Sequence, residues 1–148
     1  MHIRTATKAD LTQLSQLFDG YRVFYRKTSN FTEAQKFLRE RLENKDSEIF
    51  LCEMDDKVLS GFVQLYPLFS STRMKKLWLL NDLFVRPEHR GKGVSVALIE
   101  RAKKLVVDSD ACGMFLETEK TNDIGNQLYP KTGFEINAAS NYYEWSPK

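Results

Sequence analysis

A hydrophobic run that ends in a glycine-rich turn and leads into a helical pattern constrains the fold of this chain most strongly. Residues 77–85 read LWLLNDLFV, which is typical of a buried strand. The turn at residues 90–95 reads RGKGVS, and apolar side chains then recur from Val94 with the spacing of a helix. Residues 112–119 predict a further strand. Because a strand, a helix and a strand in this order form a crossover unit, we expect a mixed central sheet of the α/β (α+β) class.

Patterns before and after this unit predict the other elements of a single domain, residues 1–148. Thr7 with Asp10, and Thr32 with Gln35, have the spacing of capping boxes and predict the starts of two helices. The other expected strands are residues 2–5, 49–54, 58–65, 134–136 and 142–145. The sheet should therefore contain about six to seven strands, flanked by about four helices.

The composition excludes several classes of function. Of the 148 residues, 42% are hydrophobic and 28% charged, as in ordinary globular proteins. The 22 basic and 20 acidic residues give a net charge of +2, which lacks the basic excess of a nucleic-acid-binding protein. No apolar stretch is long enough to span a membrane, and no spacing of Cys or His suits a metal. We therefore expect a cytoplasmic protein with no metal, and with neither nucleic acid nor a membrane as a partner.

The glycine-rich turn has the composition of an anion site. Gly91 and Gly93 permit backbone conformations and close approaches that a side chain would block. The backbone N–H groups at the start of the following helix carry partial positive charge and suit a phosphate. Arg90 and Lys92 add positive charge. On these grounds alone the turn is either a phosphate site or an ordinary connection between a strand and a helix.

Two stretches of the chain resemble characteristic segments of the Gcn5-related N-acetyltransferase (GNAT) superfamily. Residues 80–105 resemble its acyl-CoA-binding segment, in which the pattern [R/Q]-x-x-G-x-[G/A] falls on Arg90, Gly93 and Ser95. Ser95 stands where Gly or Ala is usual. Residues 122–135, NDIGNQLYPKTGFE, resemble the family's N-x-x-A-x-x-L-Y-x-x-x-G-F segment. Two such motifs in the right order are more specific than either alone.

The resemblance implies a cofactor, acetyl-CoA, and a set of residues that bind it. The strand before the turn would offer main-chain groups to the pantetheine arm, and the turn would hold the pyrophosphate. Asn122 suits cofactor contact and equally suits a plain helix N-cap. The implied cofactor-binding residues are Phe84, Val85, Arg90, Gly91, Lys92, Gly93, Val94, Ser95 and Asn122.

The resemblance also implies catalytic roles. Tyr129 is the candidate general acid for the leaving thiolate. Glu117 is a candidate base, and with Glu119 it would lie on one face of a strand. Asp82 is another acidic candidate at the acceptor site, although strand carboxylates are commonly only solvated and water could relay the proton.

The acceptor site is implied less fully. Tyr21 and Tyr25 fall where relatives cover the acceptor, and they are equally suited to packing of the first helix. Together with Asp82 and Glu119, they are the expected acceptor-binding residues. The chain is therefore expected to be an N-acetyltransferase that moves an acetyl group to a primary amine of a small molecule or peptide, by direct attack in a ternary complex. The alternative is a non-catalytic module that binds acyl-CoA. The resemblance is also compatible with a homodimer.

Overall fold

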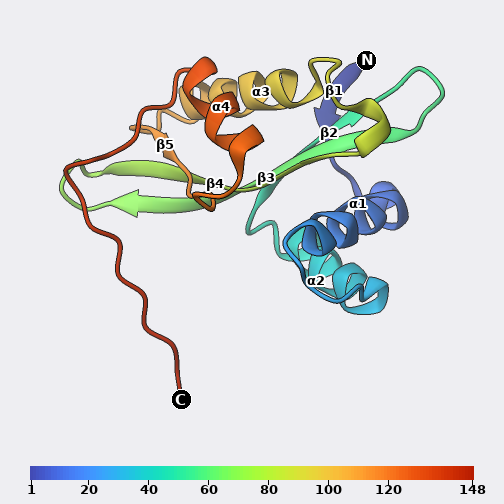
Figure 1. Cartoon of the computed structure of the whole chain (residues 1–148), viewed down its shortest axis with the longest axis horizontal. Coiled ribbons are helices and arrows are strands. Elements are labelled where there is room, and N and C mark those ends of the chain that lie inside the picture. Colours follow the sequence, from blue (N-terminus) through green and yellow to red (C-terminus); the bar gives the residue numbers. More distant parts are fainter. The chain divides into compact units, whose positions relative to one another are not determined.

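Five strands and four α-helices make up the protein, and its computed structural model describes residues 1–148 (Figure 1). These residues form two compact units, Met1–Glu117 and Thr118–Lys148. The strands are β1 (His2–Thr5), β2 (Glu48–Glu53), β3 (Leu59–Ser70), β4 (Lys75–Val85) and β5 (Met114–Phe115). The α-helices are α1 (Leu11–Phe24), α2 (Phe31–Asn44), α3 (Val94–Asp108) and α4 (Asp123–Lys131).

The sheet of the first unit has the strand order β1-β2-β3-β4-β5. Its neighbouring strands are antiparallel except β4 and β5, which are parallel and are joined by α3. The expected crossover unit is therefore confirmed, as is the mixed α/β class. Helices α1 and α2 cover one face of the sheet and α3 covers the other (Figure 1).

Side chains alternate between these two faces along the inner strands. Leu51 and Phe62 belong to the core with α1 and α2. Phe50 points to the other face, where the guanidinium carbon of Arg101 on α3 lies 3.9 Å from the centroid of its ring. Both sides of the sheet are thus buried, which explains why the strands read as nearly continuous apolar runs.

A bulge interrupts β4 at Asn81. Gln64 of β3 lies opposite Asp82, whereas the next residue, Leu65, lies opposite Leu80. Asn81 is therefore the extra residue, and a bulge of this kind bends its strand and increases the local twist. On its other side, β4 pairs with β5 only at Trp78 and Leu79, just before the bulge. As a result residues 80–85 of β4 have a strand partner on one side only.

Two expectations about strands are wrong, each for its own reason. The strand expected at residues 112–119 is only two residues long, because β4 diverges from it at the bulge. The hairpin of residues 134–136 and 142–145 does not form, and Tyr143 and Trp145 are exposed. Segments this short make a hairpin of marginal stability when no further strand supports them. The sheet therefore has five strands and not about six to seven.

The helix caps follow the sequence in part. The Asp10 carboxylate accepts a hydrogen bond from the Thr7 N–H at 2.8 Å, as expected, and a 3-10 turn, Lys8–Asp10, precedes α1. Helix α2 is capped by Asn30, whose Oδ1 accepts from the N–H of Glu33 at 3.2 Å. The capping box expected at Thr32 is therefore wrong, since Asn30 stands earlier in the chain and is itself a strong N-cap residue.

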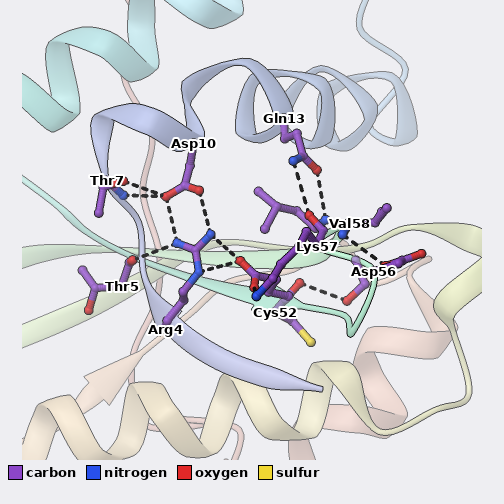
Figure 2. A network of polar contacts seen from close by, with 12 residues as sticks. Arg4, Thr5, Thr7, Asp10, Gln13, Cys52, Asp56, Lys57 and Val58 are labelled. Atoms are coloured by element: carbon purple, nitrogen blue, oxygen red, sulfur yellow. Dashed lines mark hydrogen bonds and ion pairs between the residues drawn. The ribbon is translucent and has the colours of Figure 1, made fainter.

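A polar network joins β1 to the start of α1 and to the end of β2. The Arg4 guanidinium donates to the Asp10 carboxylate at 2.7 and 2.9 Å and to Glu53 at 2.7 and 2.8 Å. Figure 2 shows Arg4 next to Asp10, and Gln13 of α1 beside the turn at Lys57 and Val58. The hydrogen bonds from Arg4 are the main reason why the pKa of Asp10 lies below its usual value. The network ties the first strand to the sheet.

Candidate functional site

The turn between β4 and α3 presents backbone N–H groups that the helix does not use. Gly91 and Gly93 have φ angles of 73° and 80°, in the left-handed region that favours glycine. The first hydrogen bond of α3 runs from the N–H of Ala97 to the carbonyl of Gly93 at 3.0 Å, so the N–H groups of Val94 and Ser95 have no acceptor in the helix. No side chain caps α3, and its first turn has no acidic residue.

This helix start contrasts with those of α2 and α4, which are capped by Asn30 and Asn122. The open N-terminus of α3 therefore keeps both its donors and its partial positive charge for a ligand. Lys92 is exposed beside it. A Cβ atom placed on Gly91 or Gly93 would meet no other atom within 4 Å, so the space beside both glycines is open.

The end of β4 has a row of main-chain groups next to this turn that no neighbouring strand pairs with. The N–H of Arg86 donates to the Ser60 carbonyl at 2.8 Å, so residue 86 faces β3. Because amide groups alternate along a strand, those of Val85 and Leu83 face the opposite side, where β4 has no strand partner. The same alternation directs the amide groups of Phe84 toward β3. Main-chain binding at this edge is thus available at Val85 and Leu83.

Arg90 folds back over this edge. Its Nε donates to the Val85 carbonyl at 3.1 Å. Its guanidinium carbon lies 5.7 Å from the ring centroids of both Phe24 and Phe84. The side chain that the motif assigns to pyrophosphate is therefore held at the junction of the turn and the free edge of β4.

Two glycines allow the close packing of Phe84. A Cβ on Gly20 of α1 would lie 3.2 Å from two ring atoms of Phe84. A Cβ on Gly61 of β3 would lie only 2.7 Å from the Phe84 carbonyl oxygen and 3.2 Å from a methyl group of Val94. The backbone at the site is thus positioned by glycines that the motifs do not include.

Asp82 lies beside the bulge as a buried carboxylate, with only 3% of the residue exposed. Its Oδ2 accepts from Gln64 Nε2 at 2.6 Å, and its Oδ1 accepts from Asn81 Nδ2 at 2.9 Å. The Tyr21 hydroxyl also hydrogen-bonds this carboxyl. Burial raises the pKa of Asp82 above its usual value, and the hydrogen bonds from Gln64, Tyr21 and Asn81 act in the opposite direction.

The structure brings Asp82 together with both tyrosines expected at the acceptor site. The hydroxyl of Tyr21 lies 3.2 Å from the carbonyl oxygen of Asn81, which the bulge exposes. The ring centroids of Tyr21 and Tyr25 are 5.1 Å apart in an edge-to-face arrangement. Tyr21 also packs against the core through Phe62. Core packing and a polar role at the site are therefore both compatible with Tyr21.

The two glutamates do not share a strand face. Strand β5 ends at Phe115, so Glu117 lies beyond the sheet with an exposed side chain, and Glu119 belongs to the second unit. The expected alternation of Glu117 and Glu119 is wrong, because the strand that would create it is too short.

The second motif forms helix α4 and its two ends. Asn122 is the N-cap, and its Oδ1 accepts from the N–H of Gly125 at 3.2 Å. At the other end the N–H of Phe134 donates to the Tyr129 carbonyl at 3.0 Å, and the N–H of Gly133 donates to the Pro130 carbonyl at 3.1 Å. These two bonds make a Schellman motif, with Gly133 at a φ of 90°.

The ring of Tyr129 takes part in that helix end. Its centroid lies 5.7 Å from that of Phe134, which is the apolar contact that accompanies a Schellman motif. Tyr129, Gly133 and Phe134 of the motif therefore share a structural role at the end of α4.

Comparison with known proteins decides the family. The model of the acetyltransferase (GNAT) family matches residues 11–134. The chain belongs to this GNAT family. It is 40% identical over 143 residues to the uncharacterized N-acetyltransferase YhfO of Bacillus subtilis, which covers 97% of this chain and 95% of that protein. It is 26% identical over 146 residues to a probable acetyltransferase of Haemophilus influenzae, and the match covers 99% of this chain and 98% of that protein. The crystal structure of a probable acetyltransferase matches with a TM-score of 0.95 and 36% identity, and the match covers 100% of this chain and 99% of that one.

Membership of the GNAT family confirms the fold and assigns acetyltransferase chemistry. The names of these relatives specify no acceptor. None of the helices is both long and apolar enough to cross a bilayer. Two residues of the candidate site are not part of either motif: Leu83, whose amide faces the free edge, and Gln64, which hydrogen-bonds Asp82. The two-residue alternation of β4 could have indicated Leu83, whereas Gln64 depends on a bulge that no local pattern marks.

Proposed function

We propose that this GNAT protein is an acetyl-CoA-dependent N-acetyltransferase, acting as one domain over residues 1–148, that acetylates a primary amine of a small molecule or peptide. The observation that carries the proposal is the uncapped N-terminus of α3 at the end of the free edge of β4. A coenzyme A thioester has a pyrophosphate and a chain of amides, and these two features match the two halves of the site.

The turn would bind the pyrophosphate through main-chain donors. The free N–H groups from Gly91 to Ser95 suit phosphate oxygens, and the left-handed glycines keep the approach open. Arg90 and Lys92 would add charge. Arg90 would turn from the Val85 carbonyl toward the phosphates.

The free edge of β4 would hold the pantetheine arm as an added strand. Val85 and Leu83 supply the outward amides, while Phe84 supports them with its ring against α1. Such pairing aligns the thioester along β4, which leads to the bulge at Asn81. The cofactor would therefore end near Asp82 and Tyr21.

The reaction we propose is direct attack of the amine nitrogen on the thioester carbonyl. Fixing the two reactants side by side removes most of the entropic barrier, and a backbone donor can stabilise the developing oxyanion. The C–S bond then breaks, and Tyr129 gives its phenol proton to the leaving thiolate. No nucleophile on the protein is required.

The acceptor reaches the site as an ammonium ion and has to lose a proton first. Asp82 is supported as the proton acceptor because it is a buried carboxylate whose hydrogen-bond partner Tyr21 is only half-buried. The phenol of Tyr21 can pass a proton to Asp82 while it takes one from the amine. Glu117 remains the second proposed base, with an exposed side chain.

An amine panel tests the proposal. Purified protein is mixed with acetyl-CoA and with an alkyl amine, a polyamine, an amino sugar or a peptide with a free N-terminus, and free thiol is measured. We expect thiol release that is saturable in both substrates with at least one amine class. Binding of CoA without release on any amine would show a non-catalytic acyl-CoA-binding module, and absence of CoA binding would overturn the proposal as a whole.

A further inference from the structure

A hydrogen-bond chain runs from the Asp82 carboxylate through Gln64 to Ser47, just before the start of β2. Gln64 lies between two partners: its Nε2 donates to Asp82 at 2.6 Å, and its Oε1 accepts from the Ser47 hydroxyl at 2.9 Å. Gln64 is fully buried, whereas Ser47 is half-buried and precedes β2. A polar amide in this apolar sheet is costly unless both its ends are paired, and here both are.

We propose that Gln64 is a positioning residue for proton transfer from the acceptor amine, because it orients the Asp82 carboxyl and can hydrogen-bond it in both protonation states. The inference rests on the proposed function and deepens it, since it adds a residue from β3 to the site.

The two states differ in the direction of every hydrogen bond in the chain. With Asp82 ionised, Ser47 donates to Gln64 and Gln64 donates to Asp82, as observed. When an ammonium N–H bond breaks and its proton reaches the Asp82 carboxylate, a carboxyl O–H forms. That O–H can donate to Gln64 Oε1 once the amide turns over, and Gln64 Nε2 can then donate to the Ser47 oxygen. The proton later leaves to water, and the chain returns to its first direction.

Few ionisable groups face Asp82. Tyr21 approaches it from α1 and Tyr66 from β3. Arg41 of α2 and Asp46 act on the Tyr66 hydroxyl and are paired with each other at 2.8 Å. Burial, together with the charge of Asp82, keeps the pKa of Tyr66 above its usual value, so this phenol remains neutral. With no cation beside it, Asp82 depends on neutral donors, and the hydrogen bond from Gln64, at 2.6 Å, is shorter than that from Asn81, at 2.9 Å.

The substitution Gln64→Met tests this role, since it keeps the length of the side chain and removes the amide. Two readouts are followed: the carboxyl carbon resonance of Asp82 against pH, and the pH profile of kcat/KM with the amine found active. Loss of a hydrogen bond to an ionised group should raise the pKa of Asp82 by about one to two units. The acid limb of the rate profile should move to higher pH by the same amount.

Two further variants distinguish the positioning role of Gln64 from a general effect on the stability of the protein. Gln13→Met removes an amide of the same kind, which bonds the backbone of Lys57 and Leu59, and it should lower stability without moving either titration. Ser47→Ala removes only the outer link and should move both titrations by a smaller amount in the same direction, which keeps the test informative if Gln64→Met fails to fold. An unchanged Asp82 titration in Gln64→Met or Ser47→Ala, or a rate profile that does not follow it, overturns the inference. Failure of the wild type on every amine contradicts the proposed function instead.

Discussion

The substitution Gly61→Ala should disturb the fold and the cofactor site together. Gly61 lies on β3 opposite Val85. The added methyl group would lie 2.7 Å from the Phe84 carbonyl oxygen, 3.2 Å from a Val94 methyl and 3.3 Å from a Val85 methyl. The first of these atoms belongs to the backbone, so a rotamer change cannot relieve the contact, and β4 has to move away from β3.

The expected cost follows from these distances. Overpacking a core in this way destabilises by about 1 to 3 kcal/mol. The smaller entropy of Ala in the unfolded chain offsets about 0.5 to 1 kcal/mol of that cost. The middle of these two ranges gives a net loss of about 1 kcal/mol, with an upper limit of about 2.5 kcal/mol, so Tm should fall by about 2 to 10 °C in a domain of this size. Because Val85 and Val94 flank the site, the KM for acetyl-CoA should rise as well.

Thermal unfolding and acetyl-CoA saturation curves measure the two effects. Gly113→Ala is the matched control, since its added methyl would meet its nearest neighbours at 3.8 Å, an ordinary contact. The control should keep or raise stability, by up to about 1 kcal/mol, because only the entropy effect of Ala remains there. If Gly61→Ala is as stable as Gly113→Ala and keeps the wild-type KM, the close approach of β3 to Phe84 does not position the site.

Three further outcomes are expected. Gly93→Ala places a side chain at a φ of 80°, which costs about 1 to 2 kcal/mol, and should raise the KM for acetyl-CoA more than it lowers kcat; an unchanged KM argues against the turn as the pyrophosphate site. Tyr129→Phe keeps the ring contact with Phe134, and the transfer rate should fall; an equal rate at every pH shows that Tyr129 is not the acid. Asp10→Asn should cost about 1 kcal/mol at pH 7 in urea unfolding. Because Arg4 lowers the folded-state pKa of Asp10, this stabilisation is present above the unfolded pKa and is lost as pH falls through the folded value. Variant and wild type should therefore converge once the pH is below the folded-state pKa; a difference that persists there contradicts the ion pair as its source.

The elements that the sequence predicts well are those with a long pattern. The run at residues 77–85, the glycine turn and the helix from Val94 predict the crossover, since periodicity and turn chemistry are local properties. The length of a strand is not local. Strand β5 is short because β4 bends away at Asn81, and the C-terminal apolar residues form no hairpin because no third strand supports them.

The candidate site also has a part that the sequence predicts and a part that it does not. The donors of the turn are predictable, because positive φ angles and an uncapped helix start follow from Gly91 and Gly93. The surroundings of Asp82 are not, because its partner Gln64 is 18 residues away and faces it only through the bulged register. The need for glycine at Gly20 and Gly61 is equally hard to predict, because it comes from close packing against Phe84, which is distant from both in the sequence.

The amide resonances of the labelled protein during titration with CoA test the central claim most directly. The account predicts saturable shifts that are largest at Gly91, Gly93, Val94 and Ser95, with further changes at Leu83 and Val85 along the free edge of β4. Binding that leaves these amides unchanged, or no saturable binding at all, would contradict the assignment of this turn and strand edge to the cofactor.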